Sequence, residues 1–327
     1  MSLWPVNLQN MNMKSINNQQ KSFMKQVIIF ILLLTGSLRV FGQQDPMYNQ
    51  YIFNSFTINS AEAGTRNIGT VSFLHRWQWL GIKGSPATSS FGIETPIGHK
   101  GWGAGINVVS DRLGPEQNQT FNIAGSYQVR LTDTYRLSAG LSFVGNMRRA
   151  SLDDLRNLYD VDDPDMAQIN TFNPNVGGGL LLYSSKNFLG ISLPRFREYK
   201  LTEMDMLPLN QLRHLFVYGG HIFAVNENLW FKPSVLFKFV NGAPTEIDLN
   251  AVVHLRKIVD VGVNYRTGDG IGLLAGLKLR DQFILNYVYE FPLTDIRFGS
   301  LKTHEIGVRY LFGKGPDHSV DSPRFFN

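Results

Sequence analysis

Cysteine is absent from the 327 residues, which excludes disulfide frameworks and thiolate metal sites. No stretch of the sequence reaches about 18 consecutive apolar residues, so membrane-spanning helices are not expected. The seven histidines include no pair at the i, i+4 spacing of a helical metal site. We therefore expect no catalytic, cofactor-binding or metal-ligating constellation.

Excess charge of one sign is also absent once the N-terminus is set aside. The formal net charge is +5, but Lys14, Lys21, Lys25 and Arg39 all precede the first acid, Asp45. Without these four, 27 basic residues stand against 26 acidic ones. A nearly neutral mature chain does not favour nucleic acid as a partner.

The N-terminal segment is typical of a secretory signal. Lys25 precedes eight apolar residues, Val27–Leu34, and the apolar character then fades towards Gly42. Val40 and Gly42 occupy the third and first positions before the expected cut, where a signal peptidase favours small or β-branched residues. We expect Sec-type signal cleavage after Gly42, so that residues 1–42 are removed, with Met24 as a candidate true start. The alternative is a cytoplasmic protein with one buried strand here.

Apolar and polar residues alternate with a period of two through the rest of the chain. In 259–266, for example, Val259, Val261, Val263 and Tyr265 interleave with polar residues and glycine. About fourteen such segments start near residues 68, 85, 101, 119, 134, 175, 187, 213, 228, 246, 257, 270, 282 and 303. Each is long enough to cross a bilayer as a tilted strand of roughly 9 to 11 residues. The pattern predicts an all-β, antiparallel transmembrane outer-membrane β-barrel over residues 68–312.

Connection lengths favour the same fold. Every connection after an even-numbered segment is short, whereas the longest ones, near residues 146–174, 194–212 and 292–302, follow odd-numbered segments. Short periplasmic turns and longer extracellular loops are typical of outer-membrane barrels. Residues 43–67 are then a periplasmic N-terminal segment or a plug, and residues 313–327 a periplasmic C-terminal extension.

Two local patterns suggest chemistry only weakly. Gly101, Gly103 and Gly105 open a strand rather than a helix, so close strand packing explains them better than dinucleotide binding. The acidic run from Asp160 to Asp165 lacks the glycine of a calcium loop. The inward-facing charges indicate a polar lumen with cross-strand ion pairs, or the lining of a porin. A barrel hydrolase lacks any supporting constellation.

Several blocks of the sequence resemble the PorP/SprF family, outer-membrane proteins of the type IX secretion system of Bacteroidota. These blocks are QQDPMYNQYIFNSFTINSAEAGT (residues 43–65), HRWQWLGIKGSPATSSFGIETPI (75–97), GWGAGINVVSDRLGP (101–115) and SPRFF (322–326). One departure is Ser60, where the family usually has proline before alanine; serine there would loosen the turn.

The resemblance implies a non-enzymatic barrel in the outer membrane. Its implied partners are outer-membrane lipid and either type IX secretion components, such as periplasmic ring or peptidoglycan-linked proteins, or the C-terminal domain of a secreted adhesin in surface adhesion or gliding motility. The alternative function is a passive outer-membrane porin for small solutes. No cofactor and no nucleic acid is expected.

Exposure on this topology suggests the residues that contact a partner. Arg76, Trp77, Trp79, Asp111 and Arg112 bracket the first two outer loops. The candidates in the C-terminal extension are Arg324, Phe325 and Phe326. The simpler explanation for this extension is a frayed terminus, and for Trp77 and Trp79 it is an aromatic girdle at the strand ends.

Overall fold

The structure is a computed structural model that describes residue 51 and residues 54–98, 100–150, 169–199, 211–280, 282–293 and 302–313. All its strands belong to one compact unit, residues 44–241 and 245–327. Two short 3-10 helices precede them, η2 (Ser55–Thr57) and η3 (Ser60–Glu62). No described helix is long and apolar enough to cross a membrane. The strands are β1 (Gly69–Leu80), β2 (Ala87–Ile97), β3 (Trp102–Leu113), β4 (Glu116–Arg130), β5 (Arg136–Ala150), β6 (Ile169–Tyr183), β7 (Asn187–Leu193), β8 (His214–His221), β9 (Phe223–Asn226), β10 (Leu229–Val240), β11 (Glu246–Leu255), β12 (Val259–Arg266), β13 (Gly270–Leu279), β14 (Phe283–Pro292) and β15 (Lys302–Phe312).

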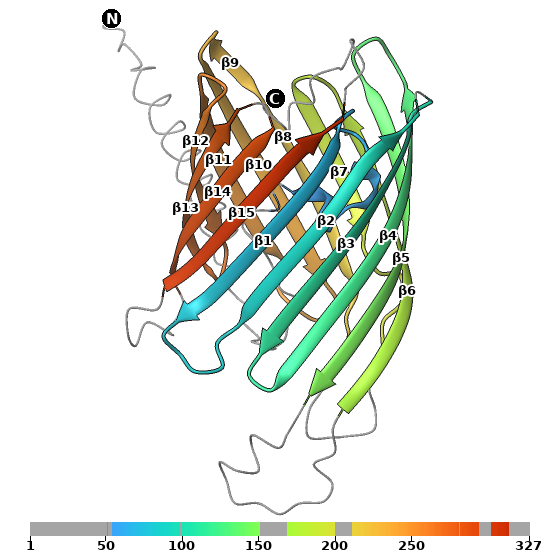
Figure 1. Cartoon of the computed structure of the whole chain (residues 1–327), viewed down its shortest axis with the longest axis vertical. Helices are drawn as coiled ribbons and strands as arrows, with labels where there is room; N and C mark the ends of the chain where they lie inside the picture. The colour runs from blue at the N-terminus through green and yellow to red at the C-terminus, as the bar shows by residue number, and fades with distance from the viewer. Residues whose placement is uncertain are drawn as a thin grey trace, which may run out of the picture. The chain divides into compact units, whose positions relative to one another are not determined.

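The sheet closes on itself as an antiparallel barrel (Figure 1). The last strand, β15, pairs with the first, β1, in a register that puts Gly69 opposite Phe312. β8 and β9 both pair with β10 and are separated only by Ile222, so together they form one interrupted strand of the wall. The described residues therefore build a closed barrel of fourteen strands, as the alternation predicted.

Each strand presents an apolar face outward and a more polar or small-residue face inward. In β13, Ile271, Leu273 and Leu277 are exposed on the outside, whereas Leu274 and the glycines between them are buried. Closure leaves no free sheet edge for backbone groups, which hydrocarbon could not satisfy. The outer surface of the barrel is therefore rich in exposed leucine, isoleucine and aromatic side chains.

The connections sort by length between the two ends of the barrel. The short-turn end carries residues 98–101, 131–135, 184–186, 227–228, 256–258 and 280–282. The long-loop end carries the three longest connections, residues 151–168, 194–213 and 293–301. It also has a two-residue turn, Gly114–Pro115, so length alone does not identify every loop of this end.

One expected loop is shorter than predicted. Residues 146–150 and 169–174, placed in a loop by the sequence pattern, pair with each other as the ends of β5 and β6. Asparagine, threonine and arginine occupy these positions and interrupt the apolar alternation, although the ladder continues from Gly145↔Pro174 to Ala150↔Ile169. The acidic run 160–165 lies outside the described residues.

Candidate functional site

Residues 54–66, the luminal segment, lie inside the barrel against its inner wall. Nearly all are buried. Asn59 begins η3 by accepting a hydrogen bond from the backbone N–H of Ala61 at 2.9 Å, and the hydroxyl of Thr65 donates to the carbonyl of Glu62 at 2.8 Å. Gly64 turns the chain with φ +68°, a conformation that glycine adopts without penalty. Local polar contacts thus fold a segment too short to hold a core of its own.

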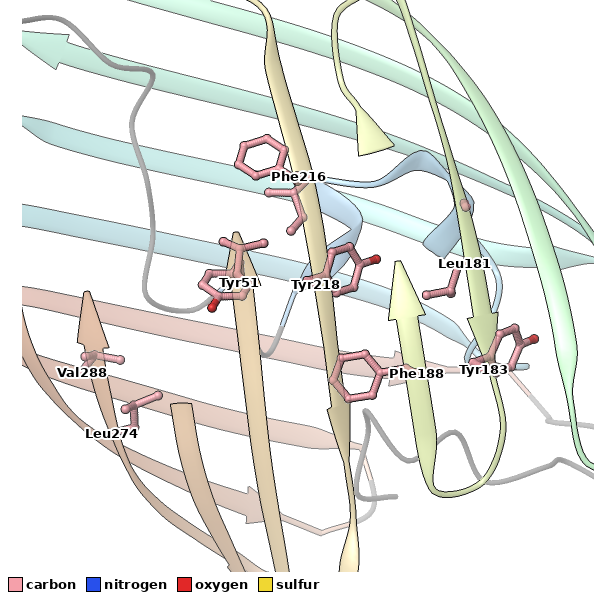
Figure 2. Close-up of a cluster of buried hydrophobic side chains, with 11 residues drawn as sticks. Tyr51, Leu181, Tyr183, Phe188, Phe216, Tyr218, Leu274 and Val288 are labelled. Atoms are coloured by element: carbon pink, nitrogen blue, oxygen red, sulfur yellow. The ribbon is translucent and has the colours of Figure 1, made fainter. Parts of the chain in front are cut away.

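Aliphatic and aromatic side chains join this segment to the wall. Tyr51, Ile58 and Ala61 form one buried cluster with Tyr218 of β8, Phe188 of β7 and residues of four further strands, β6, β10, β13 and β14. Figure 2 shows Tyr51 beside Tyr218 and Phe216, with Phe188 near them. The cavity that remains between Tyr51, Phe188 and Tyr218 measures about 20 Å³, room for about one water molecule. The segment and this side of the wall are therefore closely packed.

Three serines of the wall bind main-chain carbonyls of the luminal segment. The hydroxyl of Ser192 on β7 donates to the carbonyl of Ile58 at 2.7 Å. Ser138 on β5 donates to Ala61 at 2.7 Å, and Ser126 on β4 donates to Ala63 at 2.6 Å. Hydrogen bonds to these carbonyls offset the cost of taking backbone away from water.

Four glycines make room for the same segment. A Cβ at Gly103 would lie 2.2 Å from the carbonyl oxygen of Ala63, and one at Gly140 would lie 2.3 Å from the nitrogen of Ala61. A Cβ at Gly105 would meet the ring of Phe56 at 2.5 Å, and one at Gly179 would meet Oδ1 of Asn59 at 2.2 Å. The sequence pattern of Gly103 and Gly105 predicts close strand packing. Their inner faces instead contact the luminal segment.

Polar side chains add a second set of contacts. The Asn59 amide donates to the Tyr218 hydroxyl at 3.0 Å and to the carbonyl of Leu180 at 3.1 Å, and the Tyr218 hydroxyl donates to the carboxylate of Glu62. Nε of Arg66 lies 3.1 Å from Oε1 of Glu94 on β2, and both side chains are buried. Burial lowers the pKa of Arg66 to about 10, against the opposing effect of the Glu94 carboxylate. Arg66 remains charged at neutral pH and stays paired.

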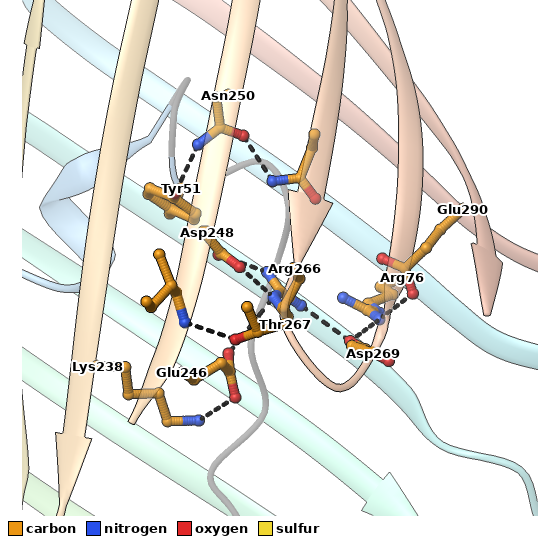
Figure 3. Close-up of polar contacts among 12 residues, drawn as sticks. Tyr51, Arg76, Lys238, Glu246, Asp248, Asn250, Arg266, Thr267, Asp269 and Glu290 are labelled. Atoms are coloured by element: carbon orange, nitrogen blue, oxygen red, sulfur yellow. Dashed lines mark hydrogen bonds and ion pairs between the residues drawn. The ribbon is translucent and has the colours of Figure 1, made fainter. Parts of the chain in front are cut away.

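A network of charged side chains lies towards the long-loop end (Figure 3). Arg76 on β1 contacts Glu290 on β14 and Glu305 on β15, each at 3.0 Å. Arg266 on β12 makes two hydrogen bonds to Asp248 on β11 and also contacts Asp269 at 3.2 Å. Lys238 on β10 completes the network through Glu246 at 3.5 Å.

A chain of amide side chains beside this charged network joins Tyr51 to β11 and β12. The amide of Asn250 on β11 donates to the Tyr51 hydroxyl at 2.7 Å, and Asn264 on β12 donates to Asn250 at 2.6 Å. Figure 3 shows Tyr51 and Asn250 above the Asp248–Arg266 pair. The polar lumen with cross-strand ion pairs, expected from the sequence, is present among the described residues.

The predicted partner-contact residues are placed differently from one another. Arg76 is only 2% exposed, and its guanidinium is held by carboxylates in the lumen. Trp77 is 39% exposed on the outer face, Trp79 is half-buried at a β-bulge with φ +54°, and Arg112 is exposed. Asp111 is partly buried and accepts a hydrogen bond from Thr88 at 2.5 Å. Arg324, Phe325 and Phe326 lie outside the described residues.

The described residues offer apolar packing and hydrogen-bonding surfaces inside the barrel. Among the described residues, no cluster of three or more His, Asp or Glu side chains is arranged to hold a metal ion. The sequence pattern does not distinguish Ser126, Ser138, Ser192, Gly140 and Gly179 from other small residues at inward positions of the strands. Their shared contact with the luminal segment can be recognised only when the register of the strands is known.

Comparison with known proteins gives one strong match. The family model described as "Type IX secretion system membrane protein PorP/SprF" matches residues 40–310. No protein with curated annotation matches the sequence significantly. The CymD monoaromatic hydrocarbon channel is similar in structure, with 11% identity, 84% of this chain and 96% of that chain covered, and a TM-score of 0.49.

Two further solved structures are comparable. A FadL homologue of Pseudomonas aeruginosa has 12% identity, coverage of 83% and 96%, and a TM-score of 0.47. The outer membrane protein Omp33 of Acinetobacter baumannii has 7% identity, coverage of 75% and 98%, and a TM-score of 0.44. Likenesses this distant say nothing about what the chain binds or transports.

Proposed function

The chain belongs to the PorP/SprF family of type IX secretion system membrane proteins, and from this premise we propose that it is a non-enzymatic outer-membrane component that assembles with the secretion machinery or helps to export and anchor a surface protein. The barrel fold and the family together support an outer-membrane location. Surface adhesion and gliding motility are the processes in which such an anchored protein would act.

The observation that carries this proposal is the occupied lumen. The luminal segment fills part of the barrel interior through contacts with β2 to β8, and ion pairs link β10 to β15 and β1. A passive porin needs an unobstructed aqueous path. Packing of chain and paired charges into the lumen supports a role in assembly more than one in solute diffusion.

The surfaces available for assembly follow from the topology. We place the short-turn end in the periplasm, where ring components or peptidoglycan-linked proteins would be reached, and the long-loop end outside, where a secreted adhesin domain would be held. Trp77, Trp79, Asp111 and Arg112 remain candidates for contact at the long-loop end. Arg76 would act beneath them by holding β1 to β14 and β15. The tail with Arg324, Phe325 and Phe326 remains a periplasmic candidate.

Conductance and co-purification test the proposal together. The purified protein is reconstituted in planar bilayers beside a trimeric porin as the positive control, and an affinity-tagged copy is isolated from its native membrane with mild detergent. We expect no steady conductance, and secretion components or a surface protein in the isolated complex. Steady open pores of uniform size, with no co-purifying partner, would establish the passive porin instead.

A further inference from the structure

We propose that the inner wall facing the luminal segment is a peptide-binding site whose ligand is a polypeptide with small side chains folded into tight turns, and that the segment is a tethered occupant that can be exchanged once its tether is cut. We call this wall surface the luminal strip; it comprises Gly103, Ser126, Ser138, Gly140, Gly179 and Ser192. This inference concerns binding and holds whether or not the chain acts in secretion.

The strip is shaped for a peptide rather than for water. Its members come from β3, β4, β5, β6 and β7, five consecutive strands, and lie on the inner face of each. At Gly103, Gly140 and Gly179 even a methyl group would overlap backbone or side-chain atoms of the luminal segment. A wall that only lines a water-filled channel would not require residues without side chains at these positions. By contrast, a Cβ at the outward-facing Gly125 would meet nothing within 4 Å.

Recognition is mainly through the ligand's backbone. The three serine hydroxyls all donate to carbonyl oxygens, those of Ile58, Ala61 and Ala63. These carbonyls lie in and beside the 3-10 turn at residues 60–62. Every residue has such a carbonyl, so these bonds select the turn conformation of the ligand and not its side chains.

Side-chain selectivity is limited to a few positions. Ala61 and Ala63 are completely buried against the wall, so larger residues would not fit there. The amide of Asn59 donates hydrogen bonds to the Tyr218 hydroxyl and to the carbonyl of Leu180. An arginine at the position of Arg66 would donate to the carboxylate of Glu94. The expected ligand is therefore an asparagine followed by small residues, with a basic residue about seven positions later.

Tethering explains why the chain's own segment occupies the strip. Arg66 is followed almost directly by β1, which begins at Gly69 and is part of the wall. So short a connection gives the segment a high effective concentration at the strip, which disfavours exchange with a free peptide while the tether is intact. Cutting the tether removes this advantage without removing any contact.

The experiment cuts the tether in the folded, full-length protein. A specific protease site is inserted after Asn67, the protein is folded and cleaved in detergent, and a fluorescent synthetic peptide of residues 51–67 is added. We expect saturable binding of one peptide per barrel, with release of the cleaved segment, and no binding of a scrambled peptide. Failure of the labelled peptide to bind the cleaved barrel would overturn the proposal.

Matched variants locate the site. Gly140→Ala should weaken binding about tenfold or more, because overpacking a tight contact typically costs 1–3 kcal/mol. Gly125→Ala, on the outer face, should change it less than about twofold. If Gly140→Ala does not give the compact, heat-modifiable barrel on gels, Ser138→Ala removes a hydroxyl without adding bulk and should weaken binding as well. Equal affinities for Ser138→Ala, Gly125→Ala and the parent would place the peptide elsewhere and refute the assignment.

Discussion

The guanidinium of Arg266 holds both carboxylate oxygens of Asp248, with Nε 2.7 Å from Oδ1 and Nη2 3.0 Å from Oδ2. The two residues face each other in the β11–β12 register, and both side chains are buried. A two-pronged contact of this kind fixes the orientation of both groups. It ties the two strands together inside the lumen, where water cannot take over the pairing.

Removing one partner of this pair should be costly. Asp248→Asn leaves a buried guanidinium with fewer negative neighbours, although Glu246 and Asp269 still contact it. Breaking a buried pair typically costs 3–5 kcal/mol, so we expect a loss of about 2–3 kcal/mol. Urea unfolding in lipid vesicles measures it. Asp133→Asn breaks the solvent-exposed pair with Arg130 and should leave the unfolding midpoint unchanged; an equal loss in both variants would contradict the burial argument.

A charged residue on the outer face should lower the free energy of unfolding most near the middle of the barrel and least near its ends. Leu141, in the part of β5 nearer the middle of the barrel, is 64% exposed, and Leu131, at the short-turn end, is 54% exposed. Leu141→Arg should lower the free energy of unfolding in vesicles by about 2–4 kcal/mol, and Leu131→Arg by no more than about 1 kcal/mol. If both arginines cost the same, the face assigned to lipid tails would not lie in the bilayer as described.

The Ser60 position should accept proline. Ser60 is the first residue of η3, its hydroxyl is buried with no hydrogen-bond partner among the described residues, and the preceding Asn59 has an extended backbone (φ −140°, ψ 115°). Proline fits the first position of a helix, and the extended residue before it is the conformation proline imposes. Ser60→Pro should stabilise the protein by about 0.4–1 kcal/mol, as measured by urea unfolding.

Ala61→Pro is the matched control for that variant. It places the same ring one residue later and removes the N–H that binds Asn59 at 2.9 Å. This variant should lower stability, because a buried acceptor loses its donor. A stabilisation by Ala61→Pro, or a loss with Ser60→Pro, would mean that the turn differs from the one described.

The Arg66–Glu94 pair should control how firmly the luminal segment is held. Arg66→Met leaves the Glu94 carboxylate buried without this partner and should cost about 3 kcal/mol, seen as faster proteolysis of the segment in the folded barrel. The double variant Arg66→Met with Glu94→Met removes both charges and should recover most of the protection. Equal proteolysis of the single and double variants would show that the pair does not retain the segment.

Much of the barrel follows from the sequence because its cause is local. Successive side chains of a strand point to opposite faces of the sheet, so the outward-facing Val261 and Val263 indicated a strand before any pairing was known. The polar ends of β5 and β6 could not be predicted in this way. Asn146 and Asn173 face each other in the β5–β6 ladder, yet neither supplies the apolar alternation that marks a strand.

The interior was less predictable because its contacts join distant parts of the chain. Arg76 was expected to meet a partner, since it adjoins a predicted outer loop, but its carboxylate partners Glu290 and Glu305 lie more than two hundred residues away. The contacts of Ser138 and Gly140 with Ala61 likewise depend on which strands become neighbours of the luminal segment. The spacing of residues along the sequence does not predict contacts between residues so far apart.

Closure of β15 onto β1 imposes an order on assembly. The seam joins the first and last strands of the wall, so it can form only after the whole polypeptide has been delivered. The luminal segment directly precedes β1, and it must therefore be enclosed while the sheet curls or inserted afterwards through an open end of the finished cylinder. A late-closing seam leaves two unpaired edges beside an uncovered peptide, and unpaired strand edges of this kind are prone to self-association.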